Sequence, residues 1–479
     1  MRKTLIIFSV LLGLSGCASM GNIAPQSRLT DANTLKTGLP EGHAAWPSER
    51  WWERYGDAQL NGLIDAALRD SPTLRVAEAR ARQARAAAGI AEAATKLTGG
   101  INASFSHDLF TATEFIPPPW AGSYNWENNL TANVSYNLDL WGRNRDALSA
   151  AIDETKVAQA ESQMARLGLE NQIVRAYLQL ALQYTLKDTL EATLRNRQRG
   201  LEVTKKRQAA GLATEVEVSQ IEALIPALQT QIEQRAEAII LLHHQLAALI
   251  GQGPEAGEAI KRPELNLASD DWLQLPATLP ADLIGRRPDV AARRWGVEAA
   301  AHGVKASKAA FYPNINLIAY AGYQGFGFND LLSAASAVRG IGPAISLPIF
   351  DGTRLRGNLA AQTASYDVAV ESYNETVLHA LESVAGTLAS AQSAQQQKHL
   401  VDAGVAAAAK AHDLAGKGYA AGLTDFLVVL SSQVLLLQQQ DAQAVIVSRQ
   451  LESYADLMLA LGGGWDGELS TQETGKAQP

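Results

Sequence analysis

The chain repeats itself at a distance of 211 residues. The tetrapeptide AAGL at Ala209–Leu212 recurs at Ala420–Leu423. A period this long exceeds the roughly 20–50 residues of a solenoid unit, so we expect two similar halves rather than a stack of small repeats. Two looser anchors keep the same order and nearly the same spacing: Pro72 with Pro288, and the WGRNR segment at Trp141 with the DGTRLR segment at Asp351.

Each half is predicted to contain one series of elements: a helix, two strands, a long helix, a glycine turn and a return helix. The first half spans 61–250 with its turn at 211, and the second spans 282–461 with its turn at 422. A segment with four prolines, 251–281, separates them, because proline breaks helices. Three further segments are expected: a signal peptide at 1–16, a lipidated N-terminal segment at 17–60 and a C-terminal tail at 462–479.

Apolar and polar side chains alternate in four segments, and alternation predicts strands. The clearest is Asn129–Leu140, where six polar–apolar pairs follow one another. Pro343 and Pro348 weaken the fourth prediction, since proline cannot donate to a strand ladder. About ten residues with one apolar face match a transmembrane barrel strand, although a soluble sheet packed on one face alternates equally well. The predicted strands are at about 99–110, 128–141, 313–324 and 339–350.

Four strands cannot close a membrane barrel, because spanning barrels begin at about eight strands. A membrane sheet therefore requires several copies of the chain, and a trimer would supply twelve strands. The expected fold class is mainly α with a membrane β-barrel: a long α-helical barrel plus four β-strands per chain, closing as a 12-stranded barrel in a trimer. Aromatic residues in the hairpin connections stand where an interfacial girdle would lie: Trp120, Tyr124, Trp126, Phe326 and Phe328.

The predicted helices are too long for a globular domain. Nothing clearly breaks the helical pattern over 143–208, which would make a helix of about 100 Å, and 353–417 predicts a matching one. The return helices show the three-and-four spacing of coiled coils. Arg235 and Asp441 interrupt their two apolar seams at comparable places. These two residues either pair across helices or each face water or the lumen.

The first residues look like a bacterial lipoprotein signal. Arg2 and Lys3 precede a mostly apolar stretch of ten residues, Leu5–Leu14, which is too short to span a bilayer. The sequence LSGC then ends at Cys17, the single cysteine of the chain. We expect lipid, including palmitate, on Cys17 and anchorage in the outer membrane, since Ala18 follows rather than an aspartate that would resemble an inner-membrane retention signal. The alternative is an ordinary signal peptide with a chance cysteine.

Composition and motifs argue against nucleic-acid binding and catalysis. The net charge is −8, from 41 Lys and Arg against 49 Asp and Glu, whereas phosphate contacts require clustered cations. A GxGxxG match at Gly462 follows a predicted helix rather than a strand, so it lacks the context of a nucleotide site. His243 and His244 point about 100° apart on a helix and cannot share a metal ion. We therefore expect no enzyme, no metal and no cofactor beyond the covalent lipid.

This combination of features resembles the TolC-like outer membrane factors. Three segments resemble the NodT-type outer membrane efflux lipoprotein branch: LIGRRPDV at 283–290, AAFYPNINL at 309–317 and LPIFDG at 347–352. The resemblance implies a homotrimer with its barrel in the outer membrane of a Gram-negative bacterium and its helices extending into the periplasm. It also implies docking with a periplasmic adaptor protein and an inner-membrane pump of RND or MFS type.

The function expected from the resemblance is an exit duct of a tripartite efflux pump that expels drugs or toxic small molecules. The partners would open this duct at its periplasmic tip. Two alternatives remain at this stage. One is an outer-membrane channel of a protein secretion system, and the other is a lipid-anchored coiled-coil scaffold with no pore.

The resemblance places the adaptor-docking tips at Gly211, Leu212, Gly422 and Leu423. Both glycines are equally compatible with an ordinary helix hairpin. The family closes its pore near the same tips, where one carboxylate per chain would form a charged ring around a three-fold axis.

Three residues are candidates for that gate. Glu217 matches a position that is often acidic in the family, and Asp425 follows the second tip. Phe426 is a candidate apolar constriction. A solvated helix-end charge or a packed aromatic ring would explain each of them as well. Val428 and Ser431 stand where some members carry aspartates, so the usual aspartate ring is in doubt here.

Overall fold

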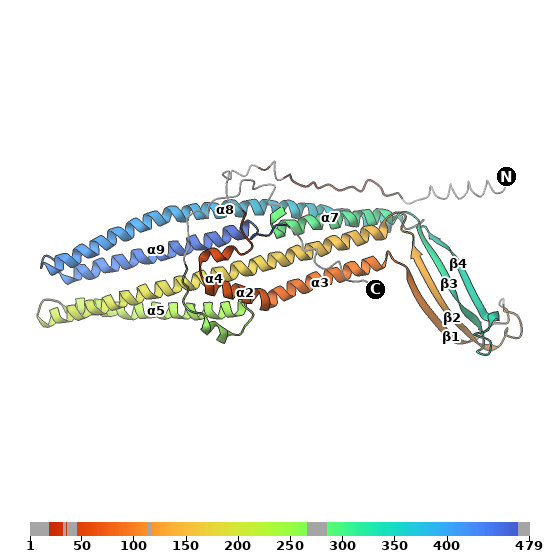
Figure 1. Cartoon of the computed structure of the whole chain (residues 1–479), viewed down its shortest axis with the longest axis horizontal. Coiled ribbons are helices and arrows are strands. Elements are labelled where there is room, and N and C mark those ends of the chain that lie inside the picture. The colour runs from red at the N-terminus through yellow and green to blue at the C-terminus, as the bar shows by residue number, and fades with distance from the viewer. Residues whose placement is uncertain (1–18, 32–34, 36–45, 114–115, 266–284, 468–479) are drawn as a thin grey trace. The chain divides into compact units, whose positions relative to one another are not determined.

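The computed structural model describes residues 19–31, 35, 46–113, 116–265 and 285–467. Cys17 lies outside the described residues. The two halves contain the same series of elements, with closely matched lengths (Figure 1). The paired helices are α3 (Pro72–Ala93) with α7 (Pro288–Ala309), α4 (Arg143–Ala209) with α8 (Gly352–Ala420), and α5 (Glu215–Leu249) with α9 (Phe426–Ala460). Pro72 and Pro288, which anchored the repeat, each begin a helix, where proline is favoured.

Contacts between residues divide the chain into two units, which are described in turn. Unit 1 comprises 1–30, 79–159 and 292–374. Unit 2 comprises 31–78, 160–291 and 375–479. Within the described part of the chain, no helix has both the length and the apolar character needed to cross a membrane.

Unit 1 contains one antiparallel sheet of four strands in the order β1-β2-β3-β4. The central pairing, β2 with β3, joins the two halves of the chain, with Ala132 opposite Ala321. Pro343 lies in β4 at the end of this order, where proline is tolerated. The strands are β1 (Thr98–Leu109), β2 (Tyr124–Asn137), β3 (Asn314–Phe326) and β4 (Ala337–Ser346).

The second strand ends four residues before its predicted end at 141, although alternation continues to Leu140. Asp139 has a φ of 41° and turns the chain out of the sheet. Its carboxylate accepts hydrogen bonds from the backbone N–H groups of Asn144 (3.0 Å) and Arg145 (2.9 Å) at the start of α4. The polar residue that looked like one more strand position is therefore a helix cap.

Many apolar residues of the sheet are exposed. Every residue of β1 is exposed, and Ile101 and Ile341 keep 79% and 78% of their surface. A soluble sheet buries one apolar face. An exposed apolar face is instead what lipid contact requires.

The N-terminal residues of unit 1 run along α8. The backbone N–H groups of Gln26 and Ser27 donate to Asp367 at 2.9 and 3.0 Å. Thr30 donates to the side chain of Asn374 at 2.8 Å. Met20 and Ile23 pack against a small core of α7, α8 and the segment after α7, formed by Val304, Phe311, Leu355 and Leu359.

Unit 2 is held together by an aromatic core. The short helix η3 (Trp51–Tyr55) buries three aromatic rings, and Tyr454 of α9 packs against Trp51 and Tyr55 with ring centroids 6.2 and 5.5 Å apart. The Tyr454 hydroxyl donates to the carbonyl of Trp51 at 3.1 Å. The helix α2 (Ala58–Asp70) follows and buries Leu60, Leu63, Ile64 and Ala67.

Taken together, the two units make a chain that is mainly helical with four strands, as the sequence predicts.

The two residues that interrupt the coiled-coil seams are half-buried. The guanidinium of Arg235 donates to Gln183 at 3.1 Å. Asp441 is shielded from solvent, and this burial raises the pKa of its carboxyl, while the positive charge of Arg235 acts in the opposite direction. Arg235 is therefore close enough to influence Asp441 electrostatically, but its hydrogen bond goes to an amide.

A buried carboxyl in α4 makes the stability of unit 2 depend on pH. Burial raises the pKa of Glu170 to about 7, although Arg166, at 3.0 Å, opposes the shift. Arg166 also pairs with Glu49 at 2.9 Å. A carboxyl whose pKa is higher in the folded chain holds its proton more tightly there, so the folded state loses stability as pH rises from about 4.5 to 7.

We therefore expect Glu170→Gln to flatten the pH dependence of unfolding. Relative to the variant, the unmodified protein should lose up to about 3 kcal/mol between pH 4.5 and 8, at about 1.4 kcal/mol per pKa unit. Denaturant unfolding followed at several pH values checks this. Arg166 keeps Glu49 as its partner in the variant. Parallel pH profiles for the two proteins would contradict the prediction.

Candidate functional site: the hairpin tips

Both hairpins of unit 2 end in the same glycine turn. Gly211 and Gly422 have φ values of 72° and 71°, a left-handed conformation that glycine adopts without strain. The N–H of Leu212 donates to the carbonyl of Arg207 at 2.7 Å, and that of Leu423 donates to Gly418 at 2.8 Å. These bonds to the fifth preceding residue define a Schellman motif, which satisfies the last carbonyls of α4 and α8.

Each turn presents an exposed leucine. Leu212 keeps 69% of its surface and Leu423 keeps 84%. Such exposure of a single leucine is common, but here the same residue stands at the same position of two separate tips. The structure thus places the four predicted tip residues as two equivalent pairs, each an αL glycine followed by an exposed leucine.

The first gate candidate, Glu217, belongs to a capping box. Thr214 is the N-cap of α5, and its hydroxyl accepts the N–H of Glu217 at 3.3 Å. The Glu217 carboxylate in turn accepts the N–H of Thr214 at 3.3 Å. The reciprocal bonds fix the start of α5, and Glu217 remains exposed.

The second candidate, Asp425, connects the two hairpins. It is the N-cap of α9, and its carboxylate accepts the N–H of Leu427 at 3.1 Å. The same carboxylate forms an ion pair with Arg207, near the end of α4. Arg207 was not singled out from the sequence. Basic residues are common in the last turn of a helix, so the position of Arg207 is not unusual. Its partner Asp425 lies 218 positions away, so the local sequence does not indicate the pairing.

The third candidate, Phe426, is half-buried against Tyr419, with ring centroids 5.1 Å apart. The first hairpin has its own ion pair at this level, Lys205 with Glu222 at 2.5 Å. The described residues hold no group of three or more His, Cys, Asp or Glu side chains arranged to bind a metal ion. The tips therefore offer exposed leucines, acidic caps and one ion pair between hairpins.

The fold is that of a known class of membrane protein. Residues 63–252 and 279–463 match the model of the outer membrane efflux protein family. The chain belongs to this family, whose members are efflux channels of the outer membrane rather than enzymes. It is thus an outer membrane protein that extends into the periplasm.

Several relatives are similar over most of the chain. Fusaric acid resistance protein FusA of Burkholderia cepacia is 43% identical over 371 residues, covering 75% of this chain and 69% of FusA. Multidrug resistance outer membrane protein MdtP of Escherichia coli K12 is 29% identical over 464 residues, covering 94% of each. The crystal structure of the outer membrane protein VceC of Vibrio cholerae matches with a TM-score of 0.80 at 38% identity, covering 88% of this chain and 100% of VceC.

Proposed function

We propose that three copies of the chain form the exit duct of a tripartite pump that expels drugs or toxic small molecules. The observation that carries this proposal is the exposed sheet of unit 1, in a chain that belongs to a family of outer membrane efflux channels. Four strands with two unpaired outer edges are stable in a bilayer only if other copies complete a closed barrel. Three chains with four strands each reach the size of spanning barrels.

Small molecules are the substrate class that the relatives favour. Two of the proteins described above are named for resistance to fusaric acid and to multiple drugs. The same duct in a protein secretion system is the alternative from the sequence, and these names argue against it. A pore has no energy source of its own, so we propose a periplasmic adaptor and an inner-membrane pump of RND or MFS type as partners.

The N-terminal segment supports lipid anchorage. Backbone N–H groups of residues 26–30 donate to Asp367 and Asn374 of α8, so the segment that follows the proposed lipid site is docked on the protein. We propose a diacylglycerol and palmitate on Cys17. Acyl chains there would add an anchor to the membrane contact of the barrel.

We propose that the tips dock the adaptor and close the pore. Gly211 and Gly422 shape the two turns, and Leu212 and Leu423 would provide the apolar contacts. Glu217, Asp425 and Phe426 would form the gate, with Arg207 as the partner that holds Asp425. In a trimer each of these side chains would appear three times around the axis, so a single residue becomes a ring.

Changing Leu212 and Leu423 to Asp together should abolish resistance while leaving the channel intact. A charge in an apolar contact costs several-fold to a hundredfold in affinity, since burial of an unpaired carboxylate is unfavourable. The measurement is the drug susceptibility of a deletion strain that carries the variant. Mass in detergent and single-channel conductance of the purified variant report on assembly.

The matched control is Leu332→Asp. Leu332 is also exposed, at 70% of its surface, but it lies in the connection between β3 and β4. It should keep both resistance and a mass near three chains. Full resistance in the tip variant would contradict docking at the leucines, and a monomer that never conducts would overturn the duct itself.

A further inference from the structure

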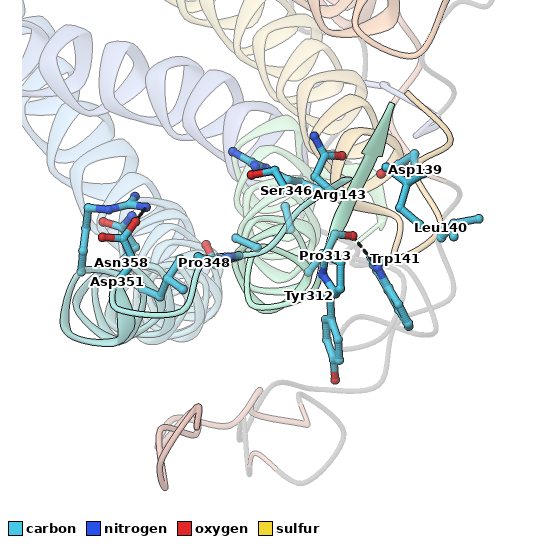
Figure 2. A pocket seen from close by; sticks show the side chains of 18 residues that line it. Asp139, Leu140, Trp141, Arg143, Tyr312, Pro313, Ser346, Pro348, Asp351 and Asn358 are labelled. Carbon is cyan, nitrogen blue, oxygen red and sulfur yellow. Dashed lines mark hydrogen bonds and ion pairs between the residues drawn. The ribbon is translucent and has the colours of Figure 1, made fainter. Parts of the chain in front are cut away.

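A cavity of about 530 Å³ lies in unit 1, where the strands meet the helices (Figure 2). Its volume is within the range of ligand pockets. Residues that follow β2 and β4 line it together with residues that precede β3, and the first turns of α4 and α8 complete it. Figure 2 shows Trp141 and Tyr312 next to each other on one side of this junction cavity and Asp351 on the other.

Aromatic pairs mark both ends of the sheet. At the end near the cavity, Trp141 stacks on Tyr312 with ring centroids 4.6 Å apart, and its indole N–H donates to the carbonyl of Pro313 at 2.9 Å. At the hairpin end, Trp126 packs on Phe328 with centroids 5.4 Å apart. Half-exposed aromatic rings at the two ends of membrane strands lie at the headgroup level of the bilayer. The helices adjoin the cavity end, so that end faces the periplasm.

The charges around the junction cavity are balanced. Arg143, the first residue of α4, is exposed, and its guanidinium makes no hydrogen bond or ion pair with any other described residue. Arg354 pairs with Asp351 at 2.6 Å. Asp139 is already used as the cap of α4. Two guanidinium groups and two carboxylates thus line one cavity, and the guanidinium of Arg143 has no ion-pair partner among the described residues.

We propose that the junction cavity binds the headgroup of a zwitterionic aminophospholipid from the periplasmic leaflet of the outer membrane. The lipid phosphate would bind Arg143, because a guanidinium matches phosphate geometry. The primary ammonium would bind Asp351. The acyl chains would continue over exposed apolar residues beside the cavity, Leu140 at 58% and Ile349 at 60% exposure.

The lining discriminates among headgroups. A phosphatidylglycerol headgroup carries no cation, so its phosphate can bind Arg143 but no group in it pairs with Asp351. A choline headgroup has a quaternary ammonium that cannot donate a hydrogen bond to Asp351. A primary ammonium both carries the positive charge and donates a hydrogen bond, so phosphatidylethanolamine fits this cavity best.

This inference rests on the placement of the sheet in the outer membrane and does not depend on what the channel exports.

Native mass spectrometry of the delipidated full-length protein tests the site, with titration by dioleoyl phosphatidylethanolamine, phosphatidylglycerol or phosphatidylcholine. We expect phosphatidylethanolamine to bind with the highest affinity and to saturate at one molecule per chain. Arg143→Gln should weaken that binding about tenfold, as expected for loss of a hydrogen bond between charged groups. Asp351→Asn should reverse the preference toward phosphatidylglycerol, because it leaves Arg354 unpaired.

The control variant is Lys308→Gln. Lys308 is an exposed cation in the last turn of α7 that does not line the cavity. Its loss should leave lipid binding unchanged if the cavity, rather than general attraction to phosphate, holds the lipid. Equal binding of the three lipids, unchanged binding in Arg143→Gln, or full competition by inorganic phosphate would overturn the proposal.

Two further outcomes separate this inference from the proposed function. If Arg143→Gln lowered the mass of the lipid-free protein, the cavity would be a contact between copies, and the lipid proposal would be wrong. If the unmodified protein bound phosphatidylethanolamine selectively but never conducted, the exit duct would be wrong and the lipid site would stand. Both measurements use the same purified sample.

Discussion

Asp425→Asn is expected to raise the conductance of the purified channel. Asparagine remains a good N-cap for α9, so the substitution removes the ion pair with Arg207 and leaves the helix start intact. An exposed ion pair contributes about 0.2–1 kcal/mol, and in the proposed trimer three copies of the pair would act on the same opening step. The closed state should therefore lose about 1–3 kcal/mol, which shifts the closed-to-open ratio by about 5- to 150-fold.

Arg207→Gln should have the same effect, because it removes the other half of the pair. The double variant should conduct no better than either single variant, since both changes break one interaction. Glu222→Gln is the matched control: it breaks a similarly exposed pair, with Lys205, that lies within a single hairpin. Additive effects of the two substitutions, or an equal rise in Glu222→Gln, would show that the Arg207–Asp425 pair is not a gate contact.

Gly322→Ala is expected to prevent assembly of the sheet. A Cβ atom at Gly322 would lie 2.1 Å from the carbonyl oxygen of Leu130 and 2.6 Å from the Cα atom of Thr131. Both are backbone atoms of β2, which cannot move without disrupting the β2–β3 pairing. The cost should be about 3 kcal/mol or more, at the upper end for an overpacked site.

The measurement is the yield of membrane-inserted protein with a mass near three chains. Gly342→Ala serves as the control, since a Cβ atom there has no neighbour within 4 Å and the residue lies in β4 of the same sheet. It should assemble normally. Normal assembly of Gly322→Ala would mean that β2 and β3 can separate without loss of the sheet. Equal failure of both variants would show that close backbone approach is not the cause.

Local patterns predict most of the fold. The glycines give the turns at Gly211 and Gly422, because glycine supplies the left-handed backbone conformation that a turn requires. The helix starts at Pro72 and Pro288 are not predicted: these prolines serve only as anchors of the repeat, although proline is favoured at the first position of a helix. The strand end near Asp139 is missed because a capping aspartate and a polar strand residue look alike in sequence. Asp139 acts as a cap because its carboxylate accepts the first N–H groups of α4, and that contact exists only in the folded chain.

The site is predicted less completely than the fold. The capping role of Glu217 is readable in the sequence, since Thr214 three positions earlier completes the capping-box signature. The pairing of Arg207 with Asp425 is not, because it depends on two hairpins from different halves of the chain meeting at their tips. The burial of Glu170 leaves no sequence signal either, since a glutamate in a long helix is usually solvated.

The hydrogen-bonded turns at Gly211 and Gly422 have a consequence for how fast and how tightly a partner can associate. Their backbones are already ordered by bonds to Arg207 and Gly418. A partner that contacts Leu212 and Leu423 therefore does not need to freeze a mobile loop, and it avoids the entropy loss that such ordering adds to association. In the proposed assembly, docking at these turns would be a rigid-body encounter, and more of the contact energy would remain as affinity.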